Sequence, residues 1–208
     1  MSTLNNGNPV NSESALNIAI LAADTATPGS GGYEIDLAGT ITLTGALEAI
    51  NLPTGVTLDI EGDNAILDGG TSGQRGLFVY SGAVSIENLT IQNMVAQGGA
   101  GGNGGGGGGA GLGGGLFIAD DTTNNAASGA VTLTAVSFNH DSAVGGAGAA
   151  PARYPGRYID EGGGGGLGGA GGAWNDSGPY TYSAGAGGGG GGIGVGAVGG
   201  RGAVETET

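Results

Sequence analysis

Three carboxylates at alternating positions are the first candidates for chemistry. Asp59, Glu61 and Asp63 fall on one face of an expected strand and its turn. Carboxylate oxygens gathered in this way could bind Ca²⁺. The EF-hand loop pattern fails, however, because Asn64 stands where that loop requires glycine. The residues therefore favour a solvated acidic face, with a Ca²⁺ site as the alternative and no other cofactor.

Acid–base catalysis has few further candidates. Asp68 and the pair Asp120–Asp121 could serve only if two carboxyl groups met about 5–10 Å apart across a cleft. The single histidine, His140, precedes Asp141, but neighbours along a strand point to opposite faces. We expect a turn histidine and no catalytic residues. The protein is predicted not to be an enzyme, and a carbohydrate-active lyase or hydrolase is the alternative.

Two segments within the glycine-rich part gather aromatic and polar side chains. Residues 151–161 contain two of the four arginines and two of the six tyrosines, and residues 174–182 contain the only tryptophan. Such mixtures are typical of adaptable binding surfaces for proteins or sugars. Packing of these side chains over the glycines is the simpler explanation, and both stay open. The candidate ligand-binding residues are Arg153, Tyr154, Arg157, Tyr158, Trp174, Tyr180 and Tyr182.

Short strands must position these side chains. Ser12 can cap a short helix that ends by Pro28–Gly29, and from Tyr33 onward apolar and polar residues alternate between glycine or proline breaks. A repeat follows, because four apolar residues recur 47 positions later. Val84, Ile86, Leu89 and Ile91 correspond to Val131, Leu133, Val136 and Phe138. Short strands repeated at this spacing predict an all-β solenoid, a β-helix, with the helix covering its open end.

Glycine makes up 54 of the 208 residues and is concentrated in residues 98–115, 145–173 and 184–202. Extended glycine segments can hydrogen-bond laterally in polyglycine-II-like layers, although ordering them costs much backbone entropy. Order and disorder of these inserts are both open. We divide the chain into a leader and capping helix (1–32), regular coils (33–97) and coils interrupted by glycine tracts (98–208), within one continuous domain.

The charge balance excludes some partners. Eighteen acids against four arginines and no lysine give a formal charge of −14, so no basic surface exists for nucleic acid. No apolar run is long enough for a membrane helix, so we expect no membrane insertion by this chain. No basic region precedes an apolar core at the N-terminus, so no export signal is expected within the chain.

The chain resembles the glycine-rich passenger segments of bacterial autotransporter-type adhesins. The resemblance is carried by residues 33–44, Leu58–Gly62, Ile66–Gly70, Arg75–Val79 and Val84–Ile91, and the second copy and glycine inserts extend it to about residue 173. It implies a right-handed parallel β-helix, export and extracellular or cell-surface display. The implied role is structural or adhesive, with a surface glycan or protein as ligand. A glycine-rich phage or host-recognition tip is a further alternative, and open coil ends would allow homo-oligomers or filaments.

Overall fold

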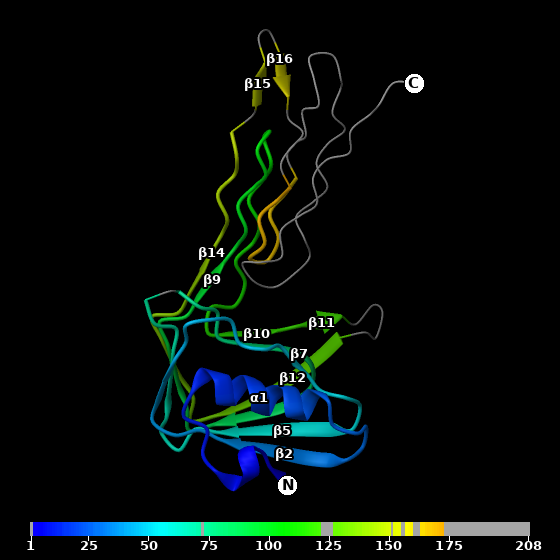
Figure 1. Cartoon of the computed structure of the whole chain (residues 1–208), viewed down its shortest axis with the longest axis vertical. Coiled ribbons are helices and arrows are strands. Elements are labelled where there is room, and N and C mark those ends of the chain that lie inside the picture. Colours follow the sequence, from blue (N-terminus) through cyan, green and yellow to red (C-terminus); the bar gives the residue numbers. More distant parts are fainter. Residues whose placement is uncertain are drawn as a thin grey trace. The chain divides into compact units, whose positions relative to one another are not determined.

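The computed structural model describes residues 2–71, 73–121, 127–150, 152–154, 157–159 and 163–172. The chain divides into two compact units. Unit 1 comprises Met1–Val95 and Gly113–Ser142, and unit 2 comprises Ala96–Leu112 and Ala143–Thr208. Unit 1 contains a helix and most of the β-strands, whereas unit 2 is dominated by glycine segments (Figure 1).

Helix α1 (Glu13–Asp24) forms where the sequence predicted it. The Ser12 side chain caps it by accepting a hydrogen bond from the Ala15 N–H at 3.3 Å. One face, with Leu16, Ala19, Ile20 and Ala23, is buried in the core of unit 1. In the described ranges no helix is long and apolar enough to cross a membrane.

The largest sheet of unit 1 is organised around one long strand, β7 (Leu77–Glu87). Its parallel neighbours are β4 (Ile50–Asn51), β5 (Val56–Glu61), β10 (Leu116–Ile118) and β12 (Ala127–Thr134). Beyond β5 lie β2 (Gly31–Asp36) and β1 (Ser2–Thr3), and beyond β12 lies β11 (Asp120–Asp121).

Several strands of the large sheet are followed along the chain by a short strand that belongs to a smaller sheet. A four-stranded parallel sheet has the order β13 (Ser137–Asn139), β8 (Thr90–Gln92), β6 (Ile66–Asp68) and β3 (Thr40–Thr42). A third pairs β9 (Val95–Gln97) with β14 (Ser142–Val144), and an antiparallel hairpin in unit 2 joins β15 (Ala152–Tyr154) to β16 (Arg157–Ile159).

The repeat read from the sequence sets the strand register. Val131 lies beside Val84, Leu133 beside Ile86 and Phe138 beside Ile91, each pair separated by the 47 residues of the repeat. This predicted alignment is confirmed. Identical inward positions therefore meet across neighbouring strands, as in the buried row Ile35, Ile60 and Ile86.

The predicted fold class, a right-handed parallel β-helix, is wrong in that the strands do not form one closed solenoid. The described strands form separate sheets of eight, four, two and two strands that do not close into one continuous solenoid, and β11–β12 and β15–β16 are antiparallel. Two features of the chain explain the difference. Residues 43–49 contain no strand where a regular coil would have one, and the glycine tracts leave the sheets to hydrogen-bond among themselves.

The corners between sheets place several residues in the left-handed backbone region. Asn88 (φ 50°) and Ala135 (φ 53°) occupy equivalent corners of the repeat, as do Asn93 (φ 55°) and His140 (φ 56°). Asparagine and histidine tolerate this conformation better than alanine, whose side chain has no polar group to hydrogen-bond locally. The second copy of the repeat is thus strained at the Ala135 corner.

Unit 2 contains five described glycine-rich segments, residues 98–103, 105–112, 145–150, 163–167 and 169–172. Segment 98–103 is hydrogen-bonded through its backbone to each of the other four. The bonds are Gly109 N–H to Gly99 O, Gly101 N–H to Ala147 O, Gly99 N–H to Gly166 O and Gly171 N–H to Ala100 O, at 2.7–2.9 Å. A strand in a sheet has only two such neighbours, so this network extends in three dimensions.

Close approach of these backbones explains the composition. A Cβ atom built on Gly99 would overlap the carbonyl oxygen of Gly169, and one on Gly146 would overlap that of Gly99. Gly107, in contrast, has open space where its Cβ would lie. Glycine is therefore required at the contact positions and tolerated at the open ones.

We predict that Ala135→Gly stabilises unit 1 by about 0.5–1 kcal/mol, because glycine relieves the left-handed strain. The same change at Ala130, in strand β12, should destabilise by a similar amount, since a strand loses backbone entropy at glycine. Urea unfolding monitored by circular dichroism measures both. Equal effects of the two substitutions would contradict the strain assigned to Ala135.

We predict that Gly99→Ala disrupts the glycine network, because its methyl group has no room beside Gly169. Gly107→Ala, in the same unit, should leave it intact. Hydrogen exchange of the unit 2 amides provides the measurement, with protection lost widely in the first variant only. Retained protection in Gly99→Ala would refute the close packing of the segments.

Candidate functional site

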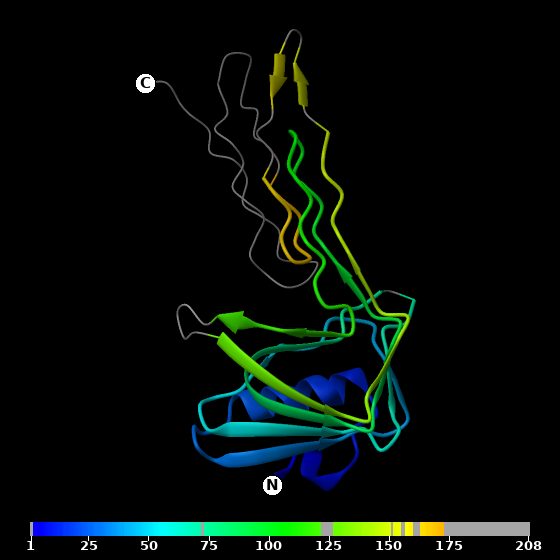
Figure 2. The same cartoon turned by 180° about the vertical axis from the view of Figure 1, so that it is seen from behind.

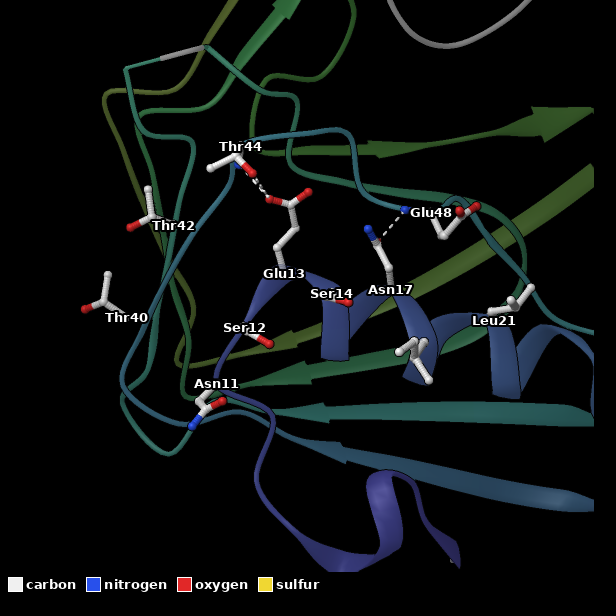
Figure 3. Close-up of a pocket in the computed structure, with 11 residues that line it drawn as sticks. Asn11, Ser12, Glu13, Ser14, Asn17, Leu21, Thr40, Thr42, Thr44 and Glu48 are labelled. Carbon is white, nitrogen blue, oxygen red and sulfur yellow. Dashed lines mark hydrogen bonds between the residues drawn. The ribbon is translucent and has the colours of Figure 1, made fainter.

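A pocket of about 740 Å³ lies between helix α1 and residues 40–48 (Figure 3). Its lining consists mainly of hydroxyl, amide and carboxylate side chains, including Ser12, Asn17, Thr40 and Glu48. Most of these groups come from the first two turns of α1 and from the outward face of β3. No sequence pattern indicates this pocket, because its two walls are far apart along the chain.

Glu13 forms the firmest contact across the pocket. Its Oε2 atom accepts hydrogen bonds from the Thr44 N–H (2.6 Å), the Thr44 hydroxyl (2.9 Å) and the Gly45 N–H (3.2 Å). Burial raises the pKa of Glu13, but these three donors stabilise the carboxylate more and bring the pKa below its ordinary value of 4.5. Glu13 is therefore a structural anion that fixes residues 44–45.

Two more α1 side chains extend this contact. Asn17 accepts from the Glu48 N–H at 2.8 Å and donates to the Ala46 carbonyl at 3.3 Å. Asp24 accepts from the Asn51 N–H at 2.8 Å, while its burial, aided by the charge of Glu48, raises its pKa despite that bond. Together with Glu13, these residues satisfy the backbone of a segment that has few strand partners. The main polar groups of the pocket thus serve the fold.

The predicted Ca²⁺ ligands are part of a longer acidic row. Asp59 and Glu61 occupy outward positions of β5, beside Glu34 and Asp36 of β2. Glu61 accepts hydrogen bonds from the Asp63 N–H (2.9 Å) and from the Asn88 amide (3.1 Å). No group of three or more ligands that could hold a metal ion occurs in the part of the chain that the structure describes.

The carboxylate of Asp68 also has a structural role. Its carboxylate accepts from the Gln92 amide (2.7 Å), the Gly70 N–H (2.8 Å) and the Asn93 amide (3.1 Å). These bonds, the one from Gln92 foremost, lower its pKa. A general acid needs the opposite shift, because it must hold its proton near neutral pH. Of the Asp120–Asp121 pair, the structure describes the backbone of β11, which is paired with β12.

The prediction of a turn histidine is confirmed. His140 is exposed at a corner with φ 56°, between β13 and β14. Its neighbour Asp141 accepts from the Met94 N–H at 2.8 Å, and burial raises the Asp141 pKa even though this bond and His140 oppose the rise. Asp141 therefore links the corner between β13 and β14 to the backbone at Met94, its equivalent in the first copy of the repeat.

The structure brings together four of the seven predicted binding residues. In the β15–β16 hairpin the register pairs Arg153 with Tyr158 and Tyr154 with Arg157. Paired positions share a face of an antiparallel ladder, so each face of the hairpin has one arginine and one tyrosine position. Trp174, Tyr180 and Tyr182 lie outside the described residues.

One cluster was missed in the sequence. The rings of Phe78 on β7 and Phe117 on β10 stack at 5.2 Å, and Tyr80 meets Phe78 edge-on at 6.2 Å. The guanidinium of Arg75 lies 5.9 Å from the centre of the Phe117 ring, and its burial lowers the Arg75 pKa. The repeated Gly-Leu-Phe motif at 76–78 and 115–117 was the available signal, since register makes repeated aromatics neighbours.

The chain matches no known family model, curated protein or solved structure. The resemblance to autotransporter-type adhesins therefore stays a prediction from sequence motifs.

We predict that Glu13→Gln destabilises unit 1 by about 1 kcal/mol at pH 7, because an amide cannot replace the charge-assisted contact with Thr44 and Gly45. The folded-state pKa of Glu13 is lowered, so its contribution is complete above the ordinary value of 4.5 and is lost as the pH falls through the folded-state value. The difference between the variant and the parent should therefore shrink on acidification.

Glu48→Gln, on the opposite wall of the same pocket, is the matched control. Glu48 contributes its backbone N–H to the contact with Asn17, so changing its side chain should have the smaller effect. Urea unfolding at several pH values measures both variants. An effect of Glu13→Gln that is independent of pH would contradict the role given to the carboxylate.

Proposed function

We propose that this is a non-enzymatic structural and adhesive protein of the cell surface or extracellular space. Its glycine segments act as a stiff support, and the Arg/Tyr hairpin β15–β16 is the recognition element. The proposed ligand is a surface glycan. The observation that supports the proposal best is the continuity of the hydrogen-bonded glycine network with this hairpin inside unit 2.

Glycine segments are an unusual choice for a support. Fixing each backbone residue costs about 1–2 kcal/mol of conformational entropy, and glycine loses more than other residues. The dense backbone bonds of unit 2 oppose this cost. Such bonds require close approach, which is why a Cβ at Gly102 or Gly165 would overlap a neighbouring carbonyl. A network this restrictive favours a mechanical role over a linker.

The hairpin follows directly from the support. Residues 145–150, which bond to Gly106 and Gly109, lead into β15, so the hairpin continues directly from a glycine segment (Figure 2). Holding a loop in place reduces the entropy lost on binding. Arginine and tyrosine supply hydrogen-bond donors and flat rings, which suit hydroxyl-rich sugars.

The carboxylates that an enzyme would use are engaged elsewhere. Glu13 and Asp68 have lowered pKa values, and each accepts three hydrogen bonds from its own fold. Glu61 accepts a hydrogen bond from the Asn88 amide at a corner of the sheets. These roles support a structural assignment over glycoside hydrolysis.

Binding of the full chain to a glycan array tests the proposal. We expect a variant with Arg153, Tyr154, Arg157 and Tyr158 all changed to Ser to lose at least about tenfold in affinity, because most binding energy resides in few aromatic and arginine contacts. Changing Asp120 and Asp121 to Asn, on the short ladder of unit 1, is the control and should leave binding unchanged.

Equal binding by both variants would remove the hairpin as the recognition element. Release of reducing ends from any bound polysaccharide would contradict the non-enzymatic assignment. As a folding control, the circular dichroism spectrum of the serine variant should match that of the parent, which would indicate that the glycine network is retained.

A further inference from the structure

The two outer edges of the sheets in unit 1 differ in how they are covered. At the β2 edge the chain's own N-terminal residues complete the pairing, with Leu4 N–H donating to Glu34 O (2.8 Å) and Val10 N–H to Asp36 O (2.7 Å). Inward residues near this edge are buried, including Ile35, Ile41 and Leu43. Helix α1 lies against the same core, so this end of the stack is closed.

The opposite edge, formed by β12 and β13, is open in the described residues. Leu133 and Phe138 occupy the same inward register as Ile86 and Ile91, yet they are 44% and 43% exposed while those two residues are fully buried. Residues 129–134 pair with β7 on one side, whereas β11 reaches only Ser128 and Ala127 on the other. Exposed apolar side chains and unpaired strand backbone therefore lie next to each other at this edge.

This edge also lacks the charges found on β2 and β5. Outward positions carry Glu34 and Asp36 on β2 and Asp59 and Glu61 on β5, but Thr132 and Thr134 on β12. On β13 the outward positions are Ser137 and Asn139. Exposed edge strands usually carry charge or proline that prevents pairing. Residues 129–134 of β12 and strand β13 carry neither charge nor proline, and the two aspartates of β11 pair only with Ala127 and Ser128.

From these three features we propose that the β12–β13 edge binds the same edge of a second copy of this chain. A two-fold axis would pair β12 with its counterpart in antiparallel fashion and bring Leu133 and Phe138 of both copies together. The formal charge of −14 means that most surfaces of two copies would repel each other. The outward positions of β12 and β13 carry no carboxylate, so two copies can meet there without this repulsion.

The closed β2 edge determines the size of the assembly. A filament needs two complementary open ends on each copy. A copy with a single open edge can pair that edge only once, so assembly stops at the dimer. The expected product is therefore a closed dimer, in place of the end-to-end filament that a regular solenoid would form.

Sedimentation equilibrium of the full chain tests this proposal. The parent should be a dimer with a dissociation constant in the range of about 1–100 µM. Replacing Thr132 and Thr134 by Glu gives β12 the acidic pattern of β2 and β5 and places like charges across the two-fold axis. We expect dimer affinity to fall at least about tenfold, since juxtaposed like charges cost several kcal/mol.

Thr40→Glu with Thr42→Glu is the matched control. These two threonines are also exposed and two positions apart, but they lie on β3 at the closed end. They should leave the dimer unchanged. All four threonines are exposed, so neither double variant removes core packing.

A parent that stays monomeric up to about 200 µM would overturn the proposal, given the affinity expected of such an edge. So would equal weakening by the two double variants, or polymers larger than a dimer that the Thr40/Thr42 variant disrupts. Hydrogen exchange of the parent adds a measurement without mutation. Protection of the Gly129–Thr134 amides should rise with protein concentration, and constant protection would also overturn the proposal.

Discussion

Backbone pairing around β7 is the interaction on which unit 1 depends. This strand pairs with β4, β5, β10 and β12, so segments from Ile50 to Thr134 are aligned by one template. Parallel pairing in register places like side chains beside like, and the rows of isoleucine and leucine this creates exclude water from the core. The aromatic stack of Phe78 and Phe117 is a further product of the same alignment.

Helix α1 compensates for what the strands do not supply. Between Leu43 and Asn51 the chain has little strand structure, and its N–H groups instead meet Glu13, Asn17 and Asp24. These residues lie along one side of α1, so a helix placed by its buried apolar face also provides a row of acceptors. The pocket of Figure 3 is formed by this arrangement.

Unit 2 rests on a different balance. It has no apolar core comparable to that of unit 1 among its described residues, and its glycine segments are joined by backbone hydrogen bonds. A single bond contributes only about 0.5–1.5 kcal/mol net. Order therefore requires many bonds per segment, and these are available only where neighbouring backbones approach without side chains. The glycine content is a packing requirement here.

The local features of this protein can be predicted from its amino-acid sequence. Ser12 and the apolar spacing after it predicted α1, the 47-residue repeat predicted the register of Leu133 with Ile86, and the isolated His140 indicated a turn. These features depend on short-range periodicity and on repeated motifs, which are visible in one chain. The tertiary structure alone decided that the sheets stay separate, that Asp68 is a brace, and that Glu13 anchors residues 44–45. Each of these depends on groups brought together from distant positions, and side-chain type cannot specify such partners. The edge at Leu133 belongs to the same class, because its residues resemble buried ones and only the missing neighbour makes them exposed.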